Sequence, residues 1–293
     1  MRVIVLHNPT AGDAEHHPEA IVSALEQAGH DVEWQSTKED DWEAALDRGA
    51  ELLVIAGGDG TVQKVFRRMT GKDVPVTLLP VGSANNVARA LGFDDDDPGR
   101  LLQGWPTARR VACDVGAISS GQTRRCFVES AGGGVFADAL GRAEEADEDL
   151  VADEKIEQGL RLLGESLAAA RPAPWELSID GDDLSGELVG LEVLNVGALG
   201  PRITLAPEAD PADALLDLVL IRNEDAATLA AYVDARREGR SPELPAFDVR
   251  RAREIVFRPP SGTPLHYDDD LLDTSDASVS VAGQVQVLVP ASR

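Results

Sequence analysis

The chain has 293 residues, 43% of them hydrophobic, and its 52 acidic against 27 basic side chains give a formal net charge of −25. This length and apolar content suffice for two modest hydrophobic cores, so we expect two domains. So negative a surface repels polyanions, which excludes a nucleic-acid-binding protein that works by neutralising phosphates.

The acidic composition also indicates the kind of solvent in which the protein folds. Only four of the basic residues are lysines, and acidic clusters recur at residues 94–97, 144–149 and 268–270. Concentrated salt screens the self-repulsion that would destabilise such a fold in dilute buffer. We therefore interpret the composition as halophilic adaptation to a high-salt cytoplasm.

The sequence carries few signals of targeting or of redox chemistry. No apolar run approaches the length of a membrane span, and residues 1–6 indicate a strand rather than a signal peptide, so we expect a cytoplasmic protein. The two cysteines, Cys113 and Cys126, have neither a metal-ligand spacing nor a secretory context. Buried free thiols are the expectation for both.

The first half of the chain is built from repeated strand-turn-helix units. Strands are expected at residues 3–6, 32–34, 52–56 and 76–79, and helices at 21–28, 41–48, 62–69 and 87–91. This alternation is typical of a doubly wound, mostly parallel α/β sheet. Ligands of such sheets bind beyond the carboxyl ends of the strands, so the turns after Leu6, Ala56 and Leu79 can converge on one ligand.

The stretch from Leu52 to Thr61 organises this half. Its five consecutive apolar residues indicate a strand covered on both faces. Gly57, Gly58 and Gly60 lack Cβ atoms, so a nucleotide phosphate can approach bare N–H groups at the positive end of the next helix. Asp59 favours phosphoryl transfer, because a carboxylate beside phosphate implies an intervening metal or hydroxyl nucleophile. An ordinary glycine-rich turn is the alternative.

The turn at residues 80–86 adds polar groups at another helix start. The hydroxyl of Ser83 and the amides of Asn85 and Asn86 suit the phosphate, sugar or base edge of a nucleotide. Taken alone, the motif would indicate only a capped helix. The predicted nucleotide site, which combines this turn with the glycine turn, comprises Asn8, Thr37, Gly57, Gly58, Asp59, Gly60, Thr61, Ser83 and Asn85.

Three motifs of this half carry a resemblance to a known family. Asn8-Pro9, Gly-Gly-Asp-Gly-Thr at 57–61 and Pro-x-Gly-Ser-x-Asn at 80–85 resemble the diacylglycerol kinase catalytic family of lipid kinases. That family includes bacterial lipid kinases and the sphingosine and ceramide kinases, and it is distantly related to NAD kinases. Its members pair a nucleotide-binding α/β domain with a β-sandwich domain and place the active site between them. The resemblance implies ATP, Mg²⁺ and a lipid acceptor met at the membrane surface.

The second half should be dominated by strands. After a hinge-like stretch at 105–109, we expect strands at 111–118, 126–129, 175–179, 188–196, 216–221, 255–257, 279–281 and 285–289. Residues 131–139 resemble the family's glycine-rich segment leading into a helix, an acidic helical region runs to about 170, and one more helix covers 226–237. Runs of strands indicate a sandwich. We therefore expect a nucleotide-binding α/β domain at 1–110 and a β-rich lipid or substrate domain at 111–293.

An acidic loop at 210–217 resembles the family's Asp-Gly-x-Leu loop, which binds a structural Mg²⁺. Hard oxygen ligands of this kind suit Mg²⁺. Transferred by position, the ligands are Asp213 with the backbones of Asp210 and Leu215. Ala214 replaces the family's glycine, so the loop backbone can differ. A plain acidic loop in an acidic protein is the alternative.

A second acidic stretch, Asp268-Asp269-Asp270, lies where the family has Asp-Gly-Glu and its proposed general base. A carboxylate should accept the proton of the lipid hydroxyl, while Mg²⁺ and positioning supply most of the catalysis. Asp270 stands in place of the glutamate and is our candidate base, with Asp268 and Asp59 as the alternatives. Like-charge repulsion within the run could raise a carboxylate pKa. A solvated acidic turn is the other interpretation.

Further departures from the family leave alternatives open. Asp13 stands where many relatives carry lysine, and Asn86 replaces an aspartate. The leading hypothesis is an ATP-dependent, Mg²⁺-requiring lipid kinase that phosphorylates a hydroxyl of a diacylglycerol-like lipid, as in phospholipid biosynthesis. The alternatives are a catalytically silent nucleotide- or lipid-binding relative and a small-molecule kinase of the NAD kinase type. The acceptor, the donor and the oligomeric state stay open, and a homodimer is among the assemblies allowed.

The halophilic interpretation predicts how stability responds to salt. We expect the thermal unfolding midpoint to rise as KCl increases from dilute to multimolar concentration, because screening weakens repulsion among the acidic side chains. Circular dichroism at each concentration measures the midpoint. A midpoint that does not rise with salt would contradict the interpretation.

Overall fold

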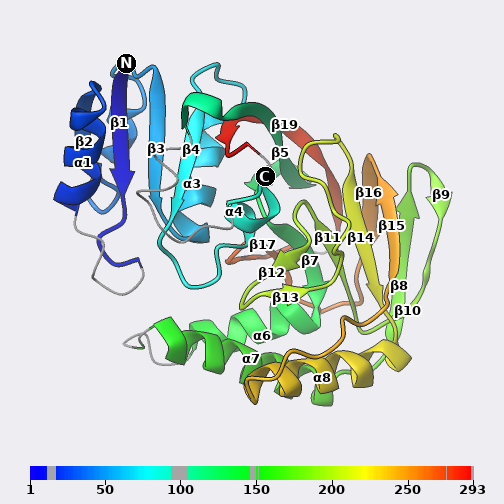
Figure 1. Cartoon of the computed structure of the whole chain (residues 1–293). Coiled ribbons are helices and arrows are strands. Elements are labelled where there is room, and N and C mark those ends of the chain that lie inside the picture. The colour runs from blue at the N-terminus through cyan, green and yellow to red at the C-terminus, as the bar shows by residue number, and fades with distance from the viewer. Residues whose placement is uncertain (12–17, 94–104, 146–149, 151, 275, 292–293) are drawn as a thin grey trace. The chain divides into compact units, whose positions relative to one another are not determined.

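The computed structural model describes residues 1–11, 18–93, 105–145, 150, 152–274 and 276–291 (Figure 1). The chain forms two compact units, one of residues 1–114 with 283–293 and the other of residues 115–282. Residues 283–293, which the sequence analysis assigned to the second domain, group with the first unit. They do so because the end of β19 (Ala277–Val289) pairs in parallel with β4 (Val76–Pro80).

The first unit is a parallel α/β sheet, as predicted. Its strands follow the order β19-β4-β3-β1-β2, with β1 at Arg2–His7, β2 at Asp31–Ser36 and β3 at Leu52–Gly57. Its helices are α1 (Pro18–Gln27), α2 (Trp42–Ala45), α3 (Asp59–Met69) and α4 (Asn86–Ala90). The helix predicted at 41–48 is shorter than expected, because only four of its residues are α-helical.

Strand β3 and helix α3 form as the sequence pattern predicts. All six residues of β3 are buried, since the strand lies between β1 and β4 in the interior of the sheet. The apolar residues of α3 that recur at helical spacing, Val62, Val65, Phe66 and Met69, are buried as well. This apolar stripe fixes which face of α3 packs against the sheet and leaves its first turn at the carboxyl edge.

The second unit contains two sheets, which confirms a β-sandwich. A six-stranded sheet has the order β15-β14-β11-β7-β17-β18 (Asp248–Ala252, Leu216–Ile221, Gly190–Leu194, Ser130–Gly134, Leu265–Tyr267 and Asp270–Leu272). The other sheet contains β10 (Gly186–Leu188), β8 (Ala173–Ile179), β16 (Glu254–Arg258) and the start of β19. Strands β5 (Arg109–Ser120), β6 (Thr123–Phe127) and β9 (Asp182–Asp183) pair at its side, and β12 (Ala198–Leu199) pairs with β13 (Ile203–Thr204).

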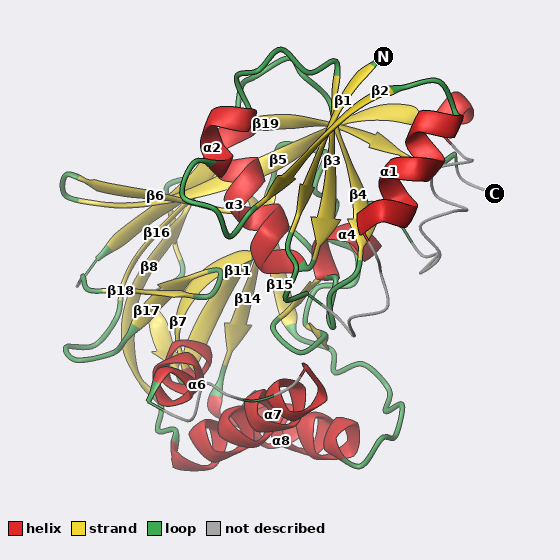
Figure 2. Ribbon diagram, turned by 90° about the vertical axis from the view of Figure 1, so that its left-hand side faces the viewer, coloured by secondary structure: helices red, strands yellow, loops and turns green. Residues whose placement is uncertain are grey.

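The central strands of the six-stranded sheet, β14, β11 and β7, are covered on both faces. Leu216, Leu218 and Leu220 of β14 enter one hydrophobic core with β8 and β16, while Val219 and Ile221 enter a second core with the helices. Those helices are α6 (Val135–Glu144), α7 (Ala152–Ala169) and α8 (Asn223–Arg237), which lie together beside this sheet (Figure 2). None of the helices in the described ranges is long and apolar enough to cross a membrane.

Several element boundaries differ from the sequence predictions. The two strands predicted at 279–281 and 285–289 form one continuous strand, which includes Gly283. A Cβ at Gly283 would lie 2.8 Å from the Thr70 side chain, so glycine fits this position. The glycine-rich segment at 130–134 is itself a strand, and the helix starts at Val135. Neither cysteine forms a disulfide, and only Cys113 is buried, so the prediction of a buried thiol was wrong for Cys126.

Candidate nucleotide and acceptor sites

Backbone hydrogen bonds join the turns at the carboxyl edge of the first sheet. The N–H of Asn8 donates to the carbonyl of Ala56 over 3.0 Å, and the N–H of Thr37 donates to the carbonyl of His7 over 2.8 Å. Asn8 also closes its own turn, because its Oδ1 accepts the N–H of Thr10 at 3.1 Å. The ends of β1, β2 and β3 therefore lie together where α/β folds bind ligands.

The glycine turn after β3 packs against the turn after β4. A Cβ on Gly82 would lie 2.4 Å from the Cα of Gly58, and one on Gly58 would lie 3.0 Å from the Cα of Gly82. Asn85 adopts the left-handed conformation with φ +53°. Its Oδ1 accepts the N–H of Gly82 at 3.1 Å, and its Nδ2 donates to the carbonyl of Gly82 at 2.6 Å. The two turns thus touch through bare backbone.

The starts of α3 and α4 are linked by Asp59. This first residue of α3 accepts the N–H of Val87 at its Oδ1, over 3.1 Å. Thr61 is buried, Gly60 is exposed and Ser83 is partly exposed. The structure therefore brings the nine predicted nucleotide residues onto joined turns and helix starts. Backbone N–H groups at the start of a helix such as α3 can bind phosphate.

An arginine on β15, Arg251, contacts the acidic residues of the loop at 210–217. Asp213 accepts the N–H of Leu215 at Oδ1 over 2.9 Å, and its Oδ2 pairs with the guanidinium of Arg251 on β15. Arg251 lies opposite Asp217 in the register of β14 and β15, and its Nε is 3.9 Å from Asp217 Oδ1. Both oxygens of Asp213 therefore face donors, and Mg²⁺ would have to compete with the Arg251 guanidinium for this carboxylate.

The rest of this loop keeps the backbone that the family's glycine allows. Ala214 has φ +61°, a left-handed conformation that costs an alanine roughly 1–2 kcal/mol. Burial and repulsion from Asp210 raise the pKa of Asp217 to about 6. Across the described residues, no three metal-ligating side chains of His, Cys, Asp or Glu cluster. The Mg²⁺ site at Asp210, Asp213 and Leu215 stays a prediction, and Asp13 lies outside the described residues.

The turn between β17 and β18 places its aspartates in different environments. Asp268 is buried, and its carboxylate accepts the N–H groups of Val128, Glu129 and Ser130 at 3.0, 2.8 and 3.4 Å. Several N–H donors stabilise a carboxylate as the anion, so this bonding suits Asp268 to hold the β6–β7 junction. Asp270 begins β18 and is exposed.

A buried ion pair, which the sequence analysis missed, lies next to this turn. Nε2 of His266 is 3.0 Å from both carboxylate oxygens of Glu192, and the two side chains are 4% and 0% exposed. Burial opposes the charged imidazole, but the Glu192 carboxylate, the carbonyl of Asp268 and the Asp268 charge outweigh it and raise the pKa of His266 to about 9. A carboxylate inside the apolar run at 188–196 is the local signal that could have drawn attention to Glu192.

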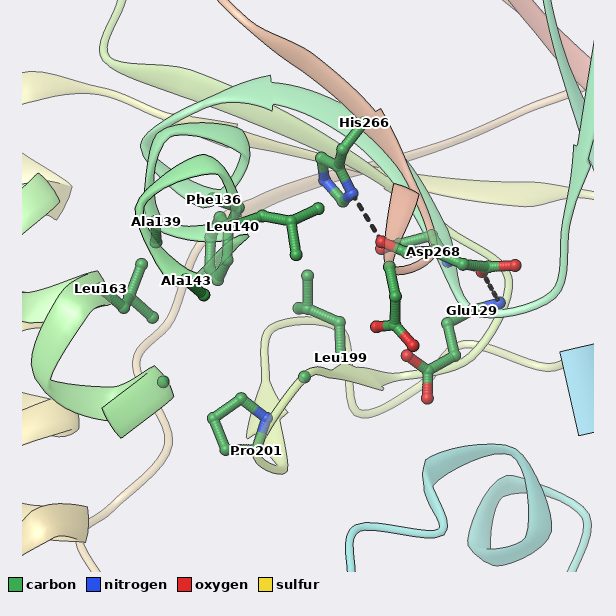
Figure 3. Close-up of a pocket in the computed structure, with 14 residues that line it drawn as sticks. Glu129, Phe136, Ala139, Leu140, Ala143, Leu163, Leu199, Pro201, His266 and Asp268 are labelled. Atoms are coloured by element: carbon green, nitrogen blue, oxygen red, sulfur yellow. Dashed lines mark hydrogen bonds between the residues drawn. The ribbon is translucent and has the colours of Figure 1, made fainter. Parts of the chain in front are cut away.

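An apolar cavity of about 130 Å³ opens beside these polar groups (Figure 3). Its apolar wall comes from α6, α7 and the β12–β13 hairpin, through Phe136, Ala139, Leu140, Ala143, Leu163, Leu199 and Pro201. Its polar end carries Glu129, His266, Asp268 and Asp269. Glu129, which the sequence analysis also missed, is 3% exposed. The cavity can take an apolar chain whose polar end meets carboxylates.

Comparison with known proteins places this architecture in a family. The profile of the diacylglycerol kinase catalytic domain matches residues 2–118, and that of the YegS C-terminal NAD kinase beta sandwich-like domain matches residues 137–289. A diacylglycerol kinase from Bacillus subtilis (strain 168) is 30% identical over 251 residues, which cover 79% of this chain and 76% of that protein. A probable lipid kinase, YegS-like, from Pseudomonas aeruginosa (strain UCBPP-PA14) is 30% identical over 229 residues, 75% of this chain and 71% of that one.

The fold agrees with solved structures. A diacylglycerol kinase from Bacillus anthracis (strain Sterne) superposes with a TM-score of 0.69 at 17% identity, over 98% of this chain and 96% of that one, which shows the fold alone. The chain belongs to the diacylglycerol kinase and YegS-like family of lipid kinases. Membership implies a phosphotransferase that takes its phosphoryl group from a nucleotide.

The contact of Arg251 with the acidic loop predicts how the nucleotide-free protein responds to Mg²⁺. We expect Mg²⁺ to raise the Tm of Arg251→Met more than that of the wild type, because removing the guanidinium leaves Asp213 and Asp217 without its positive charge. Arg253→Met is the matched control, because Arg253 is exposed and lies two residues after Arg251, just beyond the end of β15. Circular dichroism with Mg²⁺ or EDTA at constant ionic strength measures each Tm. Equal Mg²⁺ shifts in all three proteins would show that Arg251 does not compete for the loop.

Proposed function

We propose that the protein is an ATP-dependent lipid kinase that phosphorylates a hydroxyl of a diacylglycerol-like lipid. The apolar cavity with a carboxylate end is the observation that carries this proposal. Seven of its lining side chains are aliphatic or aromatic, which suits part of an acyl chain, and its polar end suits a hydroxyl that must lose a proton. The names of the relatives, diacylglycerol kinase and lipid kinase, support the same acceptor class.

The nucleotide binds, in this proposal, at the joined turns of the first unit. Gly57, Gly58, Gly60 and Thr61 lie at the start of α3, where N–H groups and the helix dipole favour phosphate. Mg²⁺ enters with ATP as the substrate complex, and the Asp59 carboxylate is the oxygen ligand that this turn offers it. The close contact of Gly58 with Gly82 leaves that approach free of side chains.

The transfer itself needs a proton acceptor for the lipid hydroxyl. Its oxygen forms a bond to the γ-phosphorus while the bond from that phosphorus to the β–γ bridging oxygen breaks, and ADP leaves. We assign the departing proton to Asp270, which stands in the place of the family's glutamate and is exposed. Asp268 is the weaker candidate, because three backbone N–H groups already use its carboxylate.

The acceptor class can be tested with γ-labelled ATP in high salt. The acceptors are diacylglycerol, long-chain bases, polyprenols, archaeol-type lipids and NAD, presented where needed in mixed vesicles at a membrane-like surface. Label on a lipid supports the proposal, whereas label on NAD alone indicates a kinase of the NAD kinase type. ATP binding without transfer to any acceptor indicates a catalytically silent relative.

The same assay tests the cavity. Ala143→Phe should raise the lipid KM roughly tenfold or more, because the added ring occupies the space of the acyl chain, while the KM for ATP is unchanged. Ala168→Phe is the matched control, because Ala168 lies on the exposed side of α7. Equal lipid KM values in the two variants would remove the cavity from the acceptor site.

Asp270→Asn tests the proton acceptor. A positioned general base contributes about 10²- to 10⁴-fold, so kcat should fall by that factor with ATP affinity nearly preserved. Asp273→Asn is the control, since Asp273 is an exposed carboxylate just beyond β18. Asp270→Glu should keep or raise the rate if the geometry resembles the family's. An unchanged kcat in Asp270→Asn would eliminate this residue as the base.

A further inference from the structure

Three residues form one row across neighbouring strands of the six-stranded sheet. Glu192 on β11 lies opposite Gly132 on β7, and Gly132 lies opposite His266 on β17. Gly132 has no side chain, so His266 reaches over it to Glu192. A Cβ at Gly132 would lie 2.8 Å from the Glu192 carboxyl carbon. The ion pair therefore depends on the glycine between its partners.

The other ring nitrogen of His266 continues the chain of contacts. Nδ1 lies 3.0 Å from the backbone carbonyl of Asp268, while Nε2 faces the Glu192 carboxylate. A backbone carbonyl and a carboxylate both accept hydrogen bonds, so this geometry suits an imidazolium whose two ring nitrogens donate. Asp268 has φ +48°, and its carboxylate in turn accepts the N–H groups of residues 128–130.

The contacts of Glu192, His266 and Asp268 connect the interior of the six-stranded sheet to two segments at the polar end of the cavity. The first segment is the β6–β7 junction, which contains Glu129, and the second is the β17–β18 turn, which contains Asp269 and Asp270. Glu129 is held from both sides, because its N–H donates to Asp268 and its carbonyl accepts the N–H of Asn195 at 2.8 Å. The relative placement of these carboxylates is therefore set by buried groups.

We propose that Glu192 and His266 are positioning residues of the acceptor site, which hold the β17–β18 turn and the β6–β7 junction in register so that their carboxylates meet the lipid hydroxyl. The inference rests on the proposed function and deepens it. Neither residue touches the phosphoryl group. Each acts through the backbone carbonyl and the carboxylate of Asp268.

Stability alone does not account for this pair. Replacing a buried ion pair by apolar residues of similar volume is often neutral or stabilising, whereas removing one partner leaves a buried charge and is strongly destabilising. Glu192 and His266 face the same core as Val219 and Leu194, where apolar side chains would fit the surroundings. The double variant Glu192→Met/His266→Phe should therefore fold, yet it lacks every hydrogen bond of the pair.

The proposal is tested by comparing two double variants in the lipid kinase assay. Misplacing a catalytic group by about 1 Å costs on the order of 10²-fold, so Glu192→Met/His266→Phe should lose roughly that factor in kcat at unchanged ATP affinity. Glu192→Gln/His266→Gln should retain most of the activity, because a glutamine amide at 266 can donate both to residue 192 and to the Asp268 carbonyl. Wild-type kcat in a folded Met/Phe variant would overturn the proposal, and so would equal losses of kcat in both variants.

A measurement on the wild type separates this inference from the proposed function and from any failure to fold. Nitrogen-15 NMR of the His266 ring at neutral pH should show both nitrogens protonated, with N–H protons that exchange slowly. A neutral or rapidly exchanging ring would overturn the positioning contact whatever the enzyme phosphorylates. If the wild type shows these signals but phosphorylates no lipid, the proposed function fails, and the assignment of the pair to an acceptor site fails with it.

Discussion

The central strands β14, β11 and β7 of the six-stranded sheet are buried on both faces, and this constraint governs the charges that they carry. Successive residues of a strand point to opposite faces, so every residue of β14 and β11 lies in one core or the other. A charged residue in such a strand is removed from solvent and needs a charged or hydrogen-bonding partner. Glu192 finds His266, and Asp217 has Arg251 opposite it on the neighbouring strand.

Glycine provides the space that these contacts need. Gly132 leaves room for an ion pair to form across a strand, and Gly58 with Gly82 lets two turns meet through backbone. In both places a Cβ would lie 3.0 Å or less from a neighbouring atom. The glycine turn of the first unit is therefore required for packing as well as for the proposed phosphate approach, so a substitution there would disturb both. Lost activity in a glycine variant would not by itself identify a phosphate site.

Features that depend on local pattern could be predicted from the sequence. The apolar run at 52–56 fixed β3, the predicted strand at 216–221 coincides with β14, and the alternation of strands and helices gave the α/β class. The glycine-rich motifs indicated the family, which the comparisons confirm. Features that depend on strand pairing could not be predicted. Gly283 reads locally as a break, but pairing of β19 on either side of it makes one strand.

The same limit applies to the candidate acceptor site. Glu129, Glu192 and His266 are far apart in the sequence, and only the register of β11, β7 and β17 brings the last two into one row. The run Asp268-Asp269-Asp270 looks like three equivalent carboxylates in an acidic chain. The structure distinguishes them, because the left-handed turn at Asp268 directs its carboxylate to the β6–β7 backbone.

In a chain with 52 acidic residues, composition cannot show which carboxylates are functional. Their partners can. A carboxylate that accepts backbone N–H groups, such as Asp268, or that faces a buried imidazole, such as Glu192, has its oxygens engaged in holding other groups in place. Asp270 stands on the exposed end of the turn that those groups hold, where a substrate can reach it. A buried, hydrogen-bonded interior that supports an accessible carboxylate suits the positioned proton transfer that we propose.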